Sequence, residues 1–248
     1  MRELFGLARS LWLYRRPGRQ RGLRRLYAPF VGEGDLVFDV GAHVGDRTLA
    51  FAALGARVAA FEPQPWLASF LRRSVGRREG IEVMAQAVGA EAGVGMLQVS
   101  RATPTVSSLN ARWTQDIGDR NPGFSRVRWD RRVEVPVTTL DRLIEIHGRP
   151  QFCKIDVEGH EAEVLAGLSQ PLEAISVEFV AGALDVARAC VERLERLGDY
   201  RFDFVIGEQR TFQWNEWRSG DTVREWLAHG AGGIASGDLY ARLSSSKN

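Results

Sequence analysis

The sequence predicts an α/β fold with a mostly parallel, twisted sheet that carries helices on both faces. Short apolar runs alternate with segments of helical period, which is the pattern of parallel strands joined by crossover helices. The first apolar run ends in an acidic residue and a glycine turn that leads into a helix. The chain of 248 residues is long enough to bury a sizeable core and lies in the range of one catalytic domain with appendages.

The expected strands and helices follow from these two patterns, the short apolar runs and the segments of helical period. Strands are expected over residues 35–40, 57–61, 81–85, 151–156, 173–179 and 201–206. Helices are expected over residues 46–54, 65–76, 139–147, 159–168 and 183–197. These elements belong to a core over residues 31–206. Residues 207–248 then extend the core with a helix over 220–229 and a closing strand at SGDLYARL.

The turn after the first strand, in VFDVGAHVG at residues 37–45, is the most informative part of the chain. Asp39 ends the strand, and Gly41 and Gly45 lead into the next helix. Gly41 can adopt backbone angles closed to other residues and leaves space for a ligand at the main chain, while the helix start offers N–H groups. The turn therefore predicts a site for a nucleotide-like cofactor.

The spacing of the glycines distinguishes between cofactors. A dinucleotide fingerprint reads G-x-G-x-x-G, and this chain has His43 and Asp46 where the second and third glycines would stand. The pattern present is D-x-G-x-x-x-G. It disfavours a nicotinamide dinucleotide.

Acidic residues follow several of the expected strands. Glu62 ends the second strand, where a carboxylate can accept hydrogen bonds from both hydroxyls of a ribose. Asp39, Asp156 and Glu178 also lie at strand ends. Because the carboxyl ends of parallel strands meet at one edge of a sheet, these carboxylates predict a ligand site there. Taken alone, Asp156 or Glu178 could instead cap a helix.

Several segments, in order, are similar to the FkbM family of S-adenosylmethionine-dependent methyltransferases. They are FDVGAHVG, FEP, AVG at 87–89, TTLD at 138–141 and KIDVEGHEAEVLAGL at 154–168. The resemblance implies a single Rossmann-like methyltransferase domain with S-adenosyl-L-methionine as cofactor. The cofactor site that it implies consists of Asp39, Gly41, Ala42, His43, Gly45, Glu62, Ala87 and Val88. His43 stands where this family often has Asn, which is a mild departure.

Methyl transfer to a hydroxyl requires a base for the hydroxyl proton, and the DVEGHE segment offers candidates. We expect Asp156, Glu158 and His160 to be the catalytic residues. His160 has a suitable unperturbed pKa for a base, but its side chain could equally cap or pack at the helix start. The same three residues could hold Mg²⁺ or Mn²⁺, although nothing in the sequence requires a metal and none is expected.

Lys154 lies on an apolar strand, where a charge is costly to bury unless it is paired. Side chains alternate along a strand, so Lys154 and Asp156 point to the same face. We therefore expect an ion pair between Lys154 and Asp156, Glu178 or another acid at a strand end.

The N-terminal segment, residues 1–30, is expected to be a basic helical extension. Residues 1–28 contain eight arginines and one acid, Glu3, and Leu4, Leu7, Ala8 and Leu11 share a helical face opposite Arg2, Arg9 and Arg16. Such a helix could cap the domain with its apolar face, or could contact an anionic membrane as a peripheral anchor. No nucleic-acid partner is expected.

Residues 101–132 interrupt the alternation of strands and helices. The segment is rich in Thr, Ser, Asn, Pro, Gly and Arg, contains Trp113, and shows no sustained period. A loop of this length is either functional or a poorly ordered insertion. We interpret it as a lid or substrate-recognition loop, in which the family resemblance makes Ser107 and Ser108 candidate polar contacts.

The remaining composition indicates a cytoplasmic protein. Cys153 and Cys190 fall at apolar positions and are expected in the core, not in a disulfide or a metal cluster. No apolar run is long enough to span a bilayer, and Arg2 and Arg9 interrupt the stretch where a signal peptide would need its apolar region.

Three function classes are compatible with these features. The first is a methyltransferase that acts on a hydroxyl of a sugar, glycolipid or secondary metabolite, so that the partner is a small-molecule or glycan acceptor. The second is a nicotinamide-dependent oxidoreductase. The third is a non-catalytic module of the same fold that docks at a membrane. The sequence defines neither the acceptor nor the oligomeric state.

Overall fold

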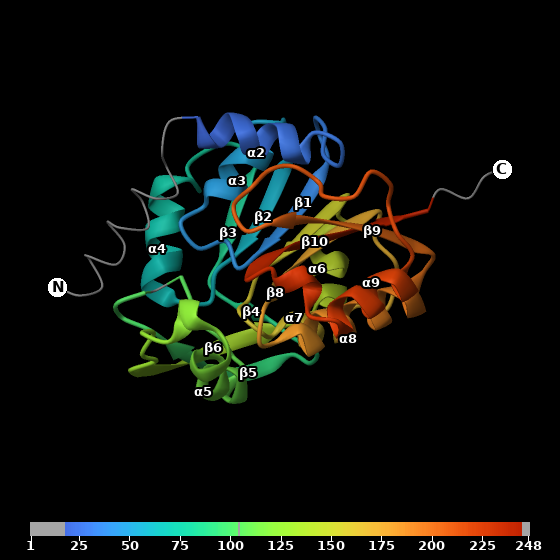
Figure 1. Cartoon of the computed structure of the whole chain (residues 1–248). Coiled ribbons are helices and arrows are strands. Elements are labelled where there is room, and N and C mark those ends of the chain that lie inside the picture. Colours follow the sequence, from blue (N-terminus) through green and yellow to red (C-terminus); the bar gives the residue numbers. More distant parts are fainter. Residues whose placement is uncertain (1–17, 104, 245–248) are drawn as a thin grey trace.

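A central sheet of seven strands organises the computed structural model, which describes residues 18–103 and 105–244 (Figure 1). Its strands are β1 (Leu36–Val40), β2 (Arg57–Phe61), β3 (Ile81–Met84), β7 (Phe152–Ile155), β8 (Ala174–Val180), β9 (Tyr200–Ile206) and β10 (Ser236–Leu243). Their order is β3-β2-β1-β7-β8-β10-β9, and only β10 runs antiparallel to its neighbours. The predicted parallel α/β sheet is confirmed.

The strand order of the sheet reverses at β1. Strands β2 and β3 follow on one side of β1, whereas β7 lies on its other side, so that Asp39 stands opposite both Ala60 and Lys154. In such sheets the connections after the two central strands diverge and leave a crevice at the strand ends. The residues after β1 and β7 therefore face each other across this crevice.

Helices cover both faces of the sheet, as predicted. On one face lie α2 (Arg19–Tyr27), α3 (Asp46–Ala52) and α4 (Pro65–Ser74). On the other lie α6 (Leu140–His147), α7 (Glu161–Ala166), α8 (Leu184–Leu197) and α9 (Gly220–Ala228). Successive residues of β1 point to opposite faces of the sheet. Val37 packs in the cluster under α2, α3 and α4, and Phe38 packs in the cluster under α6 to α9. The continuous burial of β1 follows from this double cover.

A second, three-stranded sheet lies beside the main one and was not predicted. It consists of β4 (Ala87–Val88), β5 (Gly93–Val99) and β6 (Arg131–Thr138), in the order β4-β6-β5 (Figure 1). Glycines at 93 and 95 and Pro136 interrupt the strand pattern in the sequence. Pro136 is tolerated because β4 pairs only with Val137 and Thr138, which leaves the β4 side of Pro136 unpaired.

The expectation of an irregular loop over residues 101–132 is wrong for much of its length. The segment contains α5 (Ala111–Arg120) and a 3₁₀ turn at Pro122–Phe124. Asn110 caps α5, because its side chain accepts a hydrogen bond from the Trp113 N–H at 3.0 Å. Trp113 and Ile117, one helical turn apart, are buried. An N-cap followed by an i, i+4 apolar pair was the signal for this helix.

Helix α2 forms the described part of the basic N-terminal segment. Leu23, Leu26 and Tyr27 are buried in the core cluster that also contains Phe51 of α3. Arg19 forms ion pairs with Asp46 and Glu208. Within residues 18–28 the helix therefore packs its apolar side chains against the core. The predicted face of Leu4, Leu7, Ala8 and Leu11, with Arg2, Arg9 and Arg16 opposite, lies outside the described residues.

The C-terminal part contributes an internal strand of the sheet. Strand β10 lies between β8 and β9 and pairs with both along its length, so residues 207–244 supply an internal strand of the core and do not merely extend its edge. Cys153 and Cys190 are free and buried, as predicted. None of the helices in residues 18–103 and 105–244 is both long and apolar enough to cross a bilayer.

Candidate functional site

Two adjoining cavities open at the carboxyl ends of the central strands. The first lies beside β2 and β4 and has a volume of about 50 Å³, and the second lies beside β8 and β10 and has a volume of about 270 Å³. Both are lined by Gly41, His43, Thr105, Asp156 and Glu158, so these residues form the boundary between them.

The predicted site residues are distributed unequally over these cavities. Those that line the first cavity are Gly41, His43, Glu62, Ala87, Val88, Asp156, Glu158 and His160. Ala42 lines the second cavity. Asp39 and Gly45 line neither. The sequence analysis did not single out Gln64, Gln86 and Leu97, which also line the first cavity.

Gly41 is required by a close approach between two parts of the chain. It has φ +83°, and a Cβ atom there would lie 1.9 Å from the carbonyl oxygen of Asp156. The N–H groups of Gly41 and Ala42 both donate to the Phe61 carbonyl, at 2.9 and 3.0 Å. The expectation that Gly41 leaves its main chain open for a ligand is therefore wrong for its N–H. The glycine lets the turn after β1 pass directly against the end of β7.

Asp39 stabilises this turn from the buried side, away from the cavities. Its side chain is buried and accepts a hydrogen bond from the Thr48 hydroxyl of α3 at 2.5 Å. Burial raises the pKa of Asp39, and the nearby Lys154 opposes this rise. Gly45 lies against Leu71 and Val75 of α4. Neither residue reaches the cavities, so direct contact of Asp39 or Gly45 with a cofactor stays a prediction.

Glu62 is fixed at the rim of the first cavity by the main chain. Its two carboxylate oxygens accept hydrogen bonds from the N–H groups of His43, at 3.0 Å, and Gln64, at 2.9 Å. Burial nevertheless raises the pKa of Glu62 to about 7, because these two bonds only partly offset the loss of solvent. The carboxylate is thus oriented in advance and has unused acceptor capacity toward the cavity.

Lys154 and Asp156 form the predicted buried ion pair. Lys154 Nζ lies 2.6 Å from Asp156 Oδ2, and the lysine side chain is 1% exposed. Burial alone would lower the pKa of Lys154, but the Asp156 carboxylate outweighs it and raises the pKa. In turn, Lys154 lowers the pKa of Asp156 against the effect of burial. Both groups are therefore charged.

The loop after β7 is held in a defined shape by its own helix. One carboxylate oxygen of Glu161 accepts hydrogen bonds from the N–H groups of Val157, at 3.0 Å, and Gly159, at 3.2 Å. Glu158, between them, has φ +56°, a conformation that non-glycine residues seldom adopt. Asn110 donates to the Gly159 carbonyl at 2.7 Å. The inserted segment is therefore docked onto the loop that carries Glu158.

His160 faces the first cavity from the start of α7. It occupies the N-cap position, but its side chain makes no capping hydrogen bond, so the capping alternative is not realised. Its Nδ1 lies 3.7 Å from the Glu163 carboxylate. Burial lowers the pKa of His160, with Glu163 acting in the opposite direction. The imidazole is thus mainly neutral near pH 7.

Only one of the two serines singled out in the insertion reaches a cavity. Ser107 lines the first cavity. Ser108 is buried, exchanges main-chain hydrogen bonds with Gln98, and accepts one from the Asn110 N–H through its hydroxyl. Ser108 therefore connects the insertion to β5 and lines neither cavity.

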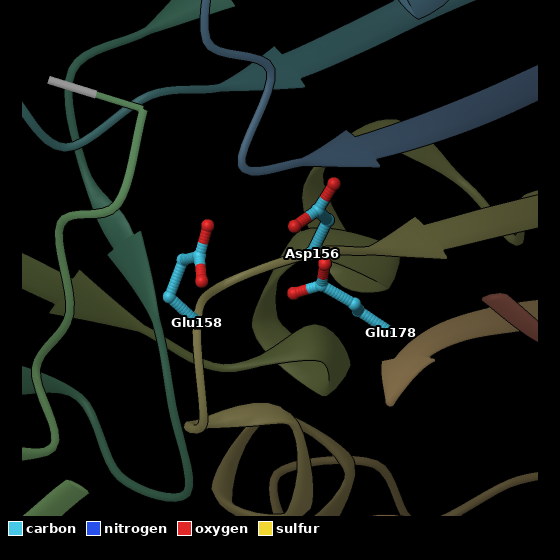
Figure 2. Close-up of side chains that lie close together, drawn as sticks. All are labelled: Asp156, Glu158 and Glu178. Carbon is cyan, nitrogen blue, oxygen red and sulfur yellow. The ribbon is translucent and has the colours of Figure 1, made fainter. Parts of the chain in front are cut away.

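Three carboxylates converge at the boundary of the cavities. One oxygen each of Asp156, Glu158 and Glu178 lies within 4.8 Å of the others (Figure 2). Burial, together with the neighbouring carboxylates, raises the pKa of both Glu158 and Glu178 well above its usual range. His160, the third residue of the metal set considered from sequence, is not part of this group. Glu178 takes that place from β8.

Comparison with known proteins gave a family match over most of the chain. Residues 39–232 match the family described as the methyltransferase FkbM domain. The chain is also 26% identical, over 214 residues, to the hexuronic acid methyltransferase AglP of Haloferax volcanii, with 81% of this chain and 82% of the relative covered.

Solved structures show only distant similarity. The precorrin-6y C5,15-methyltransferase of Geobacter metallireducens has a TM-score of 0.47 at 13% identity, covering 91% of this chain and 87% of the other. A TehB-like SAM-dependent methyltransferase of Corynebacterium glutamicum has a TM-score of 0.45 at 12% identity, covering 90% and 88%.

Proposed function

This chain belongs to the FkbM family of methyltransferases, and from that premise we propose that it transfers the methyl group of S-adenosyl-L-methionine to a hydroxyl of a sugar-type acceptor. The observation that carries this proposal is the pair of cavities that meet at Gly41, Asp156 and Glu158. Two ligands that occupy adjoining cavities can hold a methyl group and its acceptor in line at the boundary.

We assign the first cavity to the cofactor. Glu62 would accept hydrogen bonds from the ribose hydroxyls, since its carboxylate is fixed at the rim and retains acceptor capacity. Gly41, His43, Ala87 and Val88 line the same cavity and would contact the nucleoside. Asp39 and Gly45 would support the turn from behind, while Ala42 would face the acceptor side.

We assign the second cavity to the acceptor and His160 to its proton. In the transfer, the bond between the methyl carbon and sulfur breaks, its electron pair stays on sulfur, and a bond from the acceptor oxygen to the methyl carbon forms. The hydroxyl proton passes to the imidazole of His160, which is mainly neutral and lines the first cavity together with Glu158, a residue of the boundary. Asp156 and Glu158 would position the acceptor hydroxyl.

A glycan acceptor is supported by the relative and by the cavity. The relative from Haloferax volcanii is named for a hexuronic acid substrate. The second cavity presents many polar side chains, among them Arg47, Asp156, Glu178, Glu208 and Asp238. Sugars are bound mainly through hydroxyl groups, which such side chains can hydrogen-bond.

Calorimetric titration tests the cofactor assignment without a known acceptor. We expect S-adenosylhomocysteine to bind with one site per chain and NADH not to bind. Incubation with isotopically labelled S-adenosylmethionine and a panel of uronic acid and neutral glycans then tests the acceptor class. Binding of NADH in place of S-adenosylhomocysteine would favour an oxidoreductase and reject the proposal.

Glu62→Ala is expected to weaken binding of S-adenosylhomocysteine by about 1 to 3 kcal/mol, the usual cost of losing charge-assisted hydrogen bonds. Titration calorimetry of the folded variant measures this loss. Glu82→Ala, which removes an exposed acid from the neighbouring strand β3, is the matched control and should bind as the parent does. Parental affinity in Glu62→Ala would reject Glu62 as a cofactor residue.

The same affinity should depend on pH through Glu62. Ribose hydroxyls donate to the ionised carboxylate, whereas burial raises the pKa of Glu62 to about 7 in the empty site. Affinity should therefore be complete above pH 7 and fall as the pH drops through 7, by up to about tenfold per pH unit. Titrations between pH 6 and 8 should show this slope in the parent but not in Glu62→Gln, and equal slopes would contradict the prediction.

A further inference from the structure

The cluster of Asp156, Glu158 and Glu178 brings three carboxyl groups together with one positive partner. Lys154 pairs with Asp156 at 2.6 Å and balances its charge. No Lys, Arg or His within residues 18–103 and 105–244 forms an ion pair with Glu158 or Glu178. Two carboxyl groups thus have no counter-charge, and ionising both of them here is costly unless a cation binds.

Glu158 points an unpartnered oxygen into this space. Its side chain is buried, with the residue only 8% exposed, and its Oε2 has no hydrogen-bond partner in the described chain. Oε2 of Glu178 is likewise buried without a partner. Figure 2 shows the three carboxylates close together, with that of Glu178 directly below Asp156 in the view and that of Glu158 to the left. Such orphaned acceptors inside a cavity indicate a missing ligand that is positively charged or donates hydrogen bonds.

We propose that Asp156, Glu158 and Glu178 bind a divalent cation, Mg²⁺ or Mn²⁺, at the boundary of the two cavities. Carboxylate oxygens are the ligands that these ions prefer, and two unbalanced carboxylates match a charge of +2. Ligand oxygens on an octahedral ion of this size lie about 3 to 4 Å apart, so the observed spacing within 4.8 Å needs a contraction of only about 1 Å.

The arrangement also leaves positions for an acceptor. Three protein ligands occupy half of an octahedral shell, and the cluster faces the second cavity, which Asp156, Glu158 and Glu178 all line. The open positions would hold a pair of acceptor oxygens, such as vicinal hydroxyls or a hydroxyl and a carboxylate of a uronic acid. This role of the cation in acceptor binding rests on the proposed function, whereas the metal site itself does not.

The loop that carries Glu158 is built to hold this geometry. Glu161 fixes the N–H groups on both sides of Glu158, and the Asn110 amide fixes the Gly159 carbonyl. The less common backbone conformation of Glu158, at φ +56°, turns its side chain toward the cluster. Strained residues of this kind persist only where the surrounding structure over-determines them.

Titration of the metal-free, full-length protein with Mn²⁺ alone, followed by electron paramagnetic resonance, tests the site. We expect one Mn²⁺ per chain, displaced by Mg²⁺. Glu158→Gln and Glu178→Gln should each weaken Mn²⁺ binding by about tenfold or more. The matched control is Glu163→Gln, which removes an exposed glutamate of the adjacent helix α7 and should bind Mn²⁺ as the parent does.

Calorimetry with S-adenosylhomocysteine on the same proteins separates this proposal from the proposed function. Glu178→Gln should retain parental affinity, since Glu178 lines only the second cavity, and this also shows that the variant is folded. Absence of Mn²⁺ binding up to about millimolar concentration, or equal Mn²⁺ affinity in all variants, would overturn the metal site while leaving the methyltransferase proposal intact. Mn²⁺ binding without S-adenosylhomocysteine binding would support the metal site and reject the methyltransferase proposal.

Discussion

His160→Ala is expected to slow the methyl-transfer step by about a hundredfold to ten-thousandfold, the range that a general base contributes. His160 faces the first cavity, makes no capping hydrogen bond and is mainly neutral near pH 7. Affinity for S-adenosylmethionine should decrease far less than the rate, because Glu62 and its two hydrogen bonds at the end of β2 are unchanged. Single-turnover kinetics with an identified acceptor measures the step.

His229→Ala is the control for the imidazole. His229 is exposed after α9 and contacts only the Glu225 carbonyl through its ring, so its loss should leave the transfer rate unchanged. Asp156→Asn is a less specific test, since it also removes the partner of Lys154. A decrease of only a few fold in His160→Ala would reduce His160 to a positioning residue, and full activity would place the proton acceptor elsewhere.

Lys154→Met is expected to lower the free energy of unfolding by about 3 to 5 kcal/mol, the usual result of removing one partner from a buried ion pair. The Asp156 carboxylate would then remain buried beside Glu158 and Glu178 with no cation against it. Denaturant unfolding at neutral pH, without added metal, measures the change. The double variant Lys154→Met/Asp156→Asn should recover much of the loss, since both charges are then absent.

The exposed ion pair of Arg101 and Asp130 gives the comparison. These side chains are 46% and 30% exposed, and Arg101→Met should cost no more than about 1 kcal/mol. If Lys154→Met costs no more than Arg101→Met, the pair of Lys154 and Asp156 is screened by water and its burial has no energetic consequence.

The sequence predicted the main sheet because its strands are buried on both faces. Runs such as Val37–Val40 and Phe152–Ile155 are apolar enough to be recognised without neighbours. The three-stranded sheet was not predicted because β5 begins with a glycine-containing segment and β6 contains Pro136. Strands of this kind form only by pairing with each other. Helix α5 was not predicted because its Thr, Asp and Gly residues have low helix propensity, although Asn110 is a typical N-cap residue.

The candidate site was predictable where it follows one strand and its turn. Glu62 and the segment from Asp156 to His160 lie at the expected strand ends and line the cavities. Glu178 was among the acids predicted at the strand ends, but its place beside Asp156 and Glu158 depends on β8 lying next to β7, which the sequence does not state. Similarly, the role of Gly41 depends on the Asp156 carbonyl, more than a hundred residues away, and the turn pattern alone suggested a ligand instead.

The position of β10 has a consequence for how the chain acquires its structure during synthesis. Strand β8, which carries Glu178, gains its second neighbour only when β10 inserts beside it, with Asp238 opposite Glu178. Strand β9 is translated earlier but reaches the sheet only through β10. Residue 243 must therefore have left the ribosome before β10 can insert between β8 and β9. Until then β8 and β9 expose unpaired edges that favour association with other chains.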